Sequence, residues 1–213
     1  MPTNRSRVVT GLLTLVVAVA GLTPATALAR ARPATAGPER PTIVVLVIDD
    51  LPEIGLRLWR RMPVIRRTFL QHAVRFTDYV GNDPLCCPGR ATLFTGLRSR
   101  DHGVVENDAR RFDPGVTIAT ELRAKGYRTG LFGKYLNNQE NLKDKTPDGW
   151  EKVVFGGGYY TRTWWDQGER VERGTAPEDY STDYVRREAV AWLRSVGPSD
   201  PVLLWLTPFA VHS

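Results

Sequence analysis

The sequence of 213 residues holds only two cysteines, and these are adjacent at positions 86 and 87. A disulfide framework would need separated pairs, because the Cα atoms of neighbouring residues lie only ~3.8 Å apart. Pro88 suits the first turn of a helix, whose free N–H groups and dipole favour an anion beside Cys86. Arg90 adds a planar guanidinium that can pair with carboxylates. A buried structural thiol is the alternative for Cys86, and a small packing residue is the interpretation that we favour for Cys87.

Polar side chains also follow three apolar runs that we predict to be strands. They are Asp49 and Asp50 after Thr42–Ile48, Lys134 after Tyr127–Phe132, and His212 after Val202–Leu206. Ligands of α/β sheets bind outside the carboxyl ends of the strands, so these side chains are predicted to meet at one edge. The carboxylates suit a hard divalent cation, although two aspartates are also a common strand-to-turn ending.

Helical patterns separate the predicted strands. We expect helices at Met62–His72, Thr117–Lys125 and Thr182–Val196, and a short strand at Ala73–Tyr79. Gly126 follows the second of these helices at the position where a left-handed residue commonly ends a helix. Strands that alternate with helices predict an α/β fold with a mostly parallel sheet flanked by helices, and we expect the Thr42–Ile48 strand to be buried on both faces.

Two segments and one strand ending carry a family resemblance. Pro84–Gly96 (PLCCPGRATLFTG) resembles the sulfatase signature, in which Cys-x-Pro-x-Arg leads into a helix and ends at Thr-Gly. Gly126–Asn137 (GYRTGLFGKYLN) resembles the second signature, and the end of the chain resembles a strand followed by Pro-x-x-x-His-Ser. The chain thus resembles formylglycine-dependent sulfatases of the alkaline phosphatase superfamily, in particular the N-acetylglucosamine-6-sulfatase-like branch. It departs from the common pattern at Gly89, usually Ser or Ala, and at Leu136, where many members have histidine.

The resemblance implies a nucleophile and a metal. A formylglycine-generating enzyme would oxidise Cys86 to formylglycine, whose hydrate attacks sulfur with one hydroxyl and expels sulfate with the other. Asp49 and Asp50 would be the first half of a Ca²⁺ site that also binds the hydroxyl formed at position 86 and the sulfate oxygens. Cys86 therefore counts among the metal ligands as well as the catalytic residues.

The same resemblance assigns roles to three further side chains. Arg90 would hold the formylglycine side and the metal-bound carboxylates in place through its planar fork. Lys134 would stabilise negative charge on the sulfate oxygens in the transition state. His212 would lie near the leaving oxygen as a donor or general acid, although a lone histidine is more often structural.

The beginning of the chain reads as a targeting segment. We expect a signal peptide at 1–29, a disordered linker at 30–40, and the N-terminal part of a catalytic domain, incomplete, at 41–213. An uncleaved signal anchor is the alternative; otherwise the protein is secreted, without stable membrane association after cleavage. Loss of 1–29 removes two arginines and no acid, which lowers the formal charge from +6 to +4. That charge is spread along the chain, so we expect no nucleic acid partner.

The expected function is hydrolysis of sulfate esters, on sulfated amino sugars, glycosaminoglycan-like chains or aryl sulfates. An aromatic-rich region at 147–184 could stack on sugar rings or pack in the core. The family's remaining metal ligands, an Asp-Asn pair, and a further lysine have no counterpart up to Ser213, so we expect residues 1–213 alone to be inactive. The alternatives are a formylglycine-dependent phosphoester or phosphonate hydrolase and a catalytically inactive secreted fragment.

Overall fold

A computed structural model describes residues 40–51, 59–139, 146–160 and 163–212. The predicted signal peptide at 1–29 lies outside the described residues, as does the linker apart from its last residue. The described residues belong to one compact unit that begins at Arg40. Within this part of the chain, no helix is both long enough and apolar enough to cross a bilayer.

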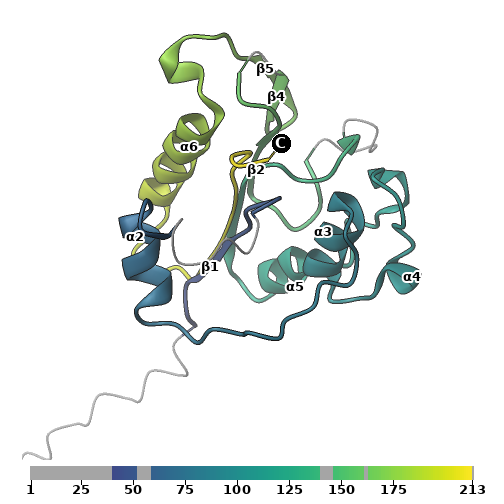
Figure 1. The fold of residues 1–213 in the computed structure, drawn as a ribbon. Helices are drawn as coiled ribbons and strands as arrows, with labels where there is room; N and C mark the ends of the chain where they lie inside the picture. Colours follow the sequence, from purple (N-terminus) through teal and green to yellow (C-terminus); the bar gives the residue numbers. More distant parts are fainter. Residues whose placement is uncertain (1–39, 52–58, 140–145, 161–162, 213) are drawn as a thin grey trace, which may run out of the picture. The chain divides into compact units, whose positions relative to one another are not determined.

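One six-stranded sheet organises the unit, in the order β1-β6-β2-β3-β4-β5 (Figure 1). The strands are β1 Ile43–Leu46, β2 Arg128–Gly133, β3 Lys152–Gly156, β4 Thr163–Asp166, β5 Glu169–Glu172 and β6 Val202–Thr207. The first four in spatial order run parallel, and β4 and β5 continue the sheet antiparallel. The predicted α/β class and mostly parallel sheet are confirmed.

Helices cover both faces of this sheet. They are α2 Pro63–Ile65, the π-helical turn η1 Arg66–Leu70, α3 Cys86–Thr95, α4 Ser99–His102, η2 Ala109–Arg111, α5 Ile118–Ala124, η4 Pro177–Asp179 and α6 Ser181–Ser195. Helices α3 and α5 lie on one face and α6 on the other (Figure 1). Because side chains alternate along a strand, Leu131 of β2 packs in the core under α3 and α5, and Phe132 packs against Trp192 of α6.

Local hydrogen bonds and a glycine define the two ends of α5. Thr117 Oγ1 caps α5 by accepting a hydrogen bond from the Thr120 amide at 3.2 Å, and Thr120 Oγ1 accepts one from the Thr117 amide at 3.0 Å. Gly126 follows with φ +80°, the left-handed conformation that glycine adopts without strain. The helices predicted at Thr117–Lys125 and Thr182–Val196 are confirmed to within one residue at each end.

Two predictions about the first third of the chain are wrong. Residues 73–79 form no strand, and Val74 and Phe76 are 81% and 78% exposed. Alternating residues are not sufficient for a strand, because the backbone also needs a partner, and 73–79 pairs with none in the described chain. Strand β1 is also not buried on both faces, because it lies at the edge of the sheet and leaves Val44 42% exposed. The helix expected at Met62–His72 is confined to α2 and η1.

Candidate active site

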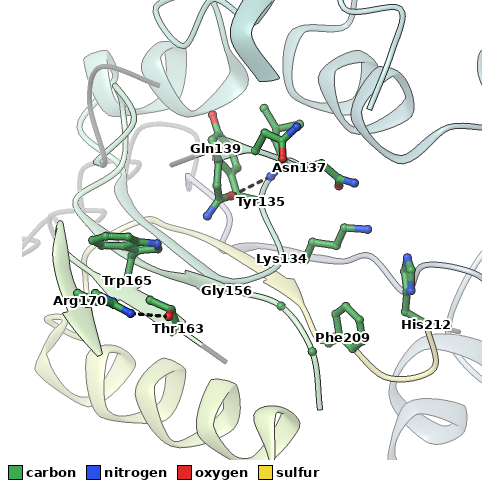
Figure 2. Close-up of a pocket in the computed structure, with 14 residues that line it drawn as sticks. Lys134, Tyr135, Asn137, Gln139, Gly156, Thr163, Trp165, Arg170, Phe209 and His212 are labelled. Carbon is green, nitrogen blue, oxygen red and sulfur yellow. Dashed lines mark hydrogen bonds between the residues drawn. The ribbon is translucent and has the colours of Figure 1, made fainter. Parts of the chain in front are cut away.

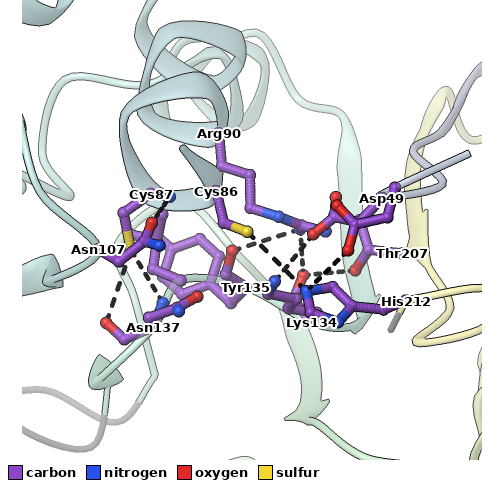
Figure 3. A network of polar contacts seen from close by, with 12 residues as sticks. Asp49, Cys86, Cys87, Arg90, Asn107, Lys134, Tyr135, Asn137, Thr207 and His212 are labelled. Carbon is purple, nitrogen blue, oxygen red and sulfur yellow. Dashed lines mark hydrogen bonds and ion pairs between the residues drawn. The ribbon is translucent and has the colours of Figure 1, made fainter. Parts of the chain in front are cut away.

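Asp49 lies between two cations just after β1 ends. Its Oδ1 accepts a hydrogen bond from Arg90 Nη2 at 2.7 Å, and its Oδ2 accepts one from Lys134 Nζ at 2.8 Å (Figure 3). All three side chains are at least 88% buried, with exposures of 4%, 11% and 12% for Arg90, Lys134 and Asp49. Burial acts to raise the pKa of Asp49, but the charges and hydrogen bonds of the two cations outweigh it. The pKa therefore lies below its ordinary value, and the carboxylate stays ionised.

Cys86 is the first residue of α3, next to this group. Leu85 is the extended N-cap residue, so the thiol sits where the helix has free N–H groups. Cys86 Sγ lies 4.0 Å from His212 Nε2, and His212 Nε2 lies 3.5 Å from Asp50 Oδ2. One ligand atom each from Asp49, Cys86 and His212 fall within 4.8 Å of one another. The structure thus brings together all the side chains that the sequence predicted at this edge (Figure 3).

Cys87 is anchored in the opposite direction, into the protein. Its amide donates to Asn107 Oδ1 at 3.0 Å, and its Sγ accepts from the Asn137 amide at 3.0 Å. The thiol is fully buried, and this burial raises its pKa above the ordinary value. A protonated, enclosed thiol is a weak nucleophile, so Cys87 is unsuited to the role that the sequence predicts for the neighbouring Cys86.

The backbone of Lys134 is held from two sides. Its amide donates to the Thr207 carbonyl at 2.8 Å, and its carbonyl accepts from Thr207 Oγ1 and Arg90 Nη1, both at 2.6 Å. The preceding Gly133 has φ +117°, and a Cβ there would lie 2.0 Å from the Thr207 carbonyl oxygen. Only glycine fits at that position, and the close approach of β2 to β6 fixes the start of the lysine side chain.

Two aromatic residues that the sequence did not point to surround His212. The Phe209 ring stacks on the imidazole at a centroid distance of 4.9 Å and 28°. Tyr159 donates a hydrogen bond from its hydroxyl to the His212 carbonyl at 2.8 Å, and its ring meets Phe209 edge to face at 5.2 Å. The adjacent Tyr159-Tyr160 pair was noticeable in the sequence, but no spacing related it to His212.

A second histidine near the signature has a structural role. His102 accepts from the Val104 amide through Nδ1 at 3.1 Å, and its Nε2 lies 3.1 Å from Thr92 Oγ1. These contacts join α4 to α3, away from Asp49. Asn107, in contrast, contacts the first turn of α3 through Cys87 and so supports the position of the neighbouring Cys86.

A cleft of about 790 Å³ opens beside Lys134 and His212 (Figure 2). Its lining continues along Gly156–Gly158 to the β4-β5 hairpin. A space of this size is in the range of pockets for small molecules and sugars. Lys134 and His212 therefore line one end of a cavity that can receive a substrate, and the predicted nucleophile Cys86 lies 4.0 Å from His212.

Among protein families, the sulfatase profile matches residues 41–213, which include every residue of this site. The chain belongs to the sulfatase family. The extracellular sulfatase SULF-1 homolog of Drosophila melanogaster is 30% identical over 187 residues, covering 81% of this chain and 16% of the relative. The N-acetylglucosamine-6-sulfatase of Homo sapiens is 29% identical over 198 residues, covering 84% of this chain and 35% of the relative.

Two solved structures show the same fold. BT4656 in complex with its substrate D-glucosamine-2-N,6-O-disulfate has a TM-score of 0.67 at 23% identity, covering 81% of this chain and 35% of that one. Ps i-CgsB in complex with k-i-k-neocarrahexaose has a TM-score of 0.65 at 20% identity, covering 82% and 46%. The sulfatase chain described here thus spans about a third or less of the curated relatives named above and under half of these structures.

Proposed function

We propose that this sulfatase chain contributes the nucleophile, the sulfate-binding cations and half of the metal site to an enzyme that hydrolyses sulfate esters. The observation that carries the proposal is the convergence of Asp49, Cys86, Arg90, Lys134 and His212 at the carboxyl ends of parallel strands, beside a cleft. Membership of the sulfatase family supports the same reaction.

The residues divide the chemical work. Formylglycine made from Cys86 by a formylglycine-generating enzyme supplies a geminal diol, in which one hydroxyl attacks sulfur and the other later expels sulfate. Lys134 Nζ is placed to neutralise charge that grows on the sulfate oxygens during the attack. His212 Nε2, 4.0 Å from Cys86 Sγ, can give a proton to the leaving oxygen. Arg90 fixes Asp49 and, through the Lys134 carbonyl, the backbone of the lysine.

The aspartates fit part of a Ca²⁺ site. Asp49 is held ionised, and Asp50 lies close enough to meet His212, so both present hard oxygens beside residue 86. In the free arrangement both oxygens of Asp49 are occupied by Arg90 and Lys134, so a bound cation would share that carboxylate with them. Two carboxylates do not fill the six to eight positions that Ca²⁺ takes, so the proposed site needs further ligands.

The substrate that we propose is a sulfated amino sugar or a glycosaminoglycan-like chain. Two relatives support it through their names, an N-acetylglucosamine-6-sulfatase and a protein whose substrate is D-glucosamine-2-N,6-O-disulfate. We also propose that the protein is exported by the segment 1–29, in keeping with relatives named extracellular sulfatases. We propose that the catalytic domain begins at residue 41, where the family match also starts.

The test of this function compares two chains, each co-expressed with a formylglycine-generating enzyme. One is residues 1–213, and the other is extended to include the Asp-Asn pair and the lysine that the family resemblance implies. On an aryl sulfate and on N-acetylglucosamine-6-sulfate, we expect turnover from the extended chain only, because a cation held by two carboxylates lacks preorganised geometry. Absence of turnover by an extended chain that carries the aldehyde at 86 would overturn the function. Turnover by 1–213 within tenfold of the extended chain, about 1.4 kcal/mol, would overturn the need for further ligands.

A further inference from the structure

The cleft beside Lys134 and His212 has a second end that the proposed sulfate chemistry does not use. Thr163 and Trp165 of β4 and Arg170 of β5 lie together there, away from the first two side chains (Figure 2). The floor between the two ends is backbone, because Gly156–Gly158 contribute no side chains. A Cβ on Gly156 would lie 2.5 Å from the Trp164 ring, so close packing leaves no room for a side chain at that position.

The charges lining the cleft have one sign. Lys134 supplies positive charge at one end and Arg170 at the other, and none of the described residues that line the cleft is Asp or Glu. A cleft with cations at both ends and no lining carboxylate favours a ligand with more than one negative group. One negative group of such a ligand is the sulfate that is hydrolysed. Arg170 is then available to bind a second negative group.

Arg170 is held loosely enough to change partner. Its side chain is 63% exposed, and its Nη2 pairs with the equally exposed carboxylate of Glu172 on the same strand. Its contact with Thr163 Oγ1 is long, at 3.4 Å. Exposed ion pairs contribute little net free energy, so a ligand anion can compete with Glu172 for the guanidinium.

Trp165 places an aromatic ring next to this cation. It lies directly opposite Arg170 in the antiparallel register of β4 and β5, so the two side chains share a face of the hairpin. The indole is half-buried and packs on Phe155 at 6.4 Å, which fixes its orientation. The fixed indole offers an apolar surface for a sugar ring. The guanidinium beside it offers paired N–H donors for an acidic substituent of that ring.

We propose that Trp165 and Arg170 form a second subsite, which binds a further sulfate or carboxylate of an acidic sugar substrate. The proposal rests on the proposed function and narrows it, because substrates with a second anion are then preferred over simple sulfate esters. Arg170 binds the anion, Trp165 packs against the ring that carries it, and Glu172 competes with the ligand for Arg170.

Binding measurements on the Cys86→Ala variant of the extended chain test the subsite without turnover. The probes form two matched pairs. In the first, a uronate linked to glucosamine-6-sulfate is compared with the same disaccharide whose carboxylate is reduced to an alcohol. In the second, glucosamine-2-N,6-O-disulfate is compared with glucosamine-6-sulfate. Titration calorimetry gives the ratio of affinities within each pair, and the pair that depends on Arg170 identifies the second anion.

We expect the doubly anionic member of one pair to bind about tenfold more tightly, and Arg170→Gln to remove that preference. Glu172→Gln, which removes the competitor, should increase the preference. Arg194→Gln on α6, an exposed arginine on the other face of the sheet, is the charge-matched control and should leave both ratios unchanged. Ratios that are the same in Arg170→Gln as in the parent chain overturn the subsite while the proposed function stands. Failure of the parent chain to bind any of the four probes overturns the proposed function and the subsite with it.

Discussion

The charged groups at the two ends of β2 differ in burial and in the balance of positive and negative charge. At the start of the strand, Arg128 donates to Glu151, with Nε to Oε2 at 2.5 Å, and also pairs with Asp200 at 3.3 Å. Arg123 joins the same Glu151 at 2.7 Å. Two arginines and two carboxylates thus balance at the surface. After the end of β2, Arg90 and Lys134 share the single carboxylate of Asp49, and all three are largely buried.

This difference separates charges that serve stability from charges that serve chemistry. The pairs at the start of β2 are partly exposed, so desolvation costs little and each contributes at most about 1 kcal/mol. Burial of Arg90, Lys134 and Asp49 carries a desolvation cost that the attraction between them only partly offsets. Apolar side chains of similar volume would stabilise that end as well or better. The buried group therefore indicates a function, and it lies where the cleft opens.

The largest effect is expected at Cys86. In the extended, aldehyde-bearing enzyme, Cys86→Ala should lower kcat by ~10³-fold or more, because the nucleophile is gone. Cys87→Ala should keep the aldehyde at 86 and lose only stability, about 1 kcal/mol, since Cys87 is a buried anchor. Tryptic mass spectrometry locates the aldehyde. Its appearance at 87, or at neither position in an active enzyme, would refute the assignment.

Metal removal should have the next largest effect. Exhaustive chelation of the extended enzyme should lower kcat on the order of 10²-fold or more, and Ca²⁺ or a similar hard cation should restore it. Chelation should lower kcat by the same factor in Asp200→Asn as in the parent, because Asp200 belongs to the ion pairs at the start of β2 and not to the proposed metal site. Full activity after chelation would show that Asp49 and Asp50 hold no catalytic cation.

The smallest effect is expected at the start of β2 and concerns stability alone. The hydrogen bond from Arg128, together with the neighbouring charges, lowers the pKa of Glu151 from 4.5 to about 2, against the opposing effect of partial burial. The folded state therefore binds this proton less readily than the unfolded state. The stabilisation is complete above about pH 4.5 and is lost as the pH falls toward 2.

Glu151→Gln tests that stabilisation. Because the arginines that pair with Glu151 are partly exposed, the substitution should cost only about 0.5 to 1 kcal/mol of unfolding free energy at pH 7. Denaturant titrations of the two chains at pH 7 and near pH 2.5 should show a difference that shrinks in acid. A difference that is the same at both pH values would mean that the ion pair is not its cause. In the extended enzyme, kcat should stay within twofold of the parent.

The candidate site could be predicted where its residues follow strand ends or a fixed spacing. Asp49 and Lys134 come directly after apolar runs, and parallel strands bring their carboxyl ends to one edge whatever the details of packing. The aromatic-rich region at 147–184 suggested stacking on sugar rings, but the pairing of Trp165 with Arg170 could not be predicted, because it depends on a hairpin whose strands are short and mixed in polarity. The strand expected at 73–79 was wrong for a related reason, since strand pairing depends on a distant partner that alternation does not reveal.

The close contact at Gly133 divides the cleft into a part that resists variation and a part that tolerates it. Any side chain at 133 would collide with Thr207, and a shift of Thr207 would release both the amide and the carbonyl of Lys134. A mutant library directed at Gly133 and Thr207 should therefore consist mostly of inactive variants. The β4-β5 hairpin carries exposed side chains such as Arg170 and Glu172 beside a turn at Gln167-Gly168, so these residues can be exchanged without moving the lysine. Directed evolution of a new sugar preference should accordingly draw its successful variants from residues 163–172, with the reaction itself unchanged.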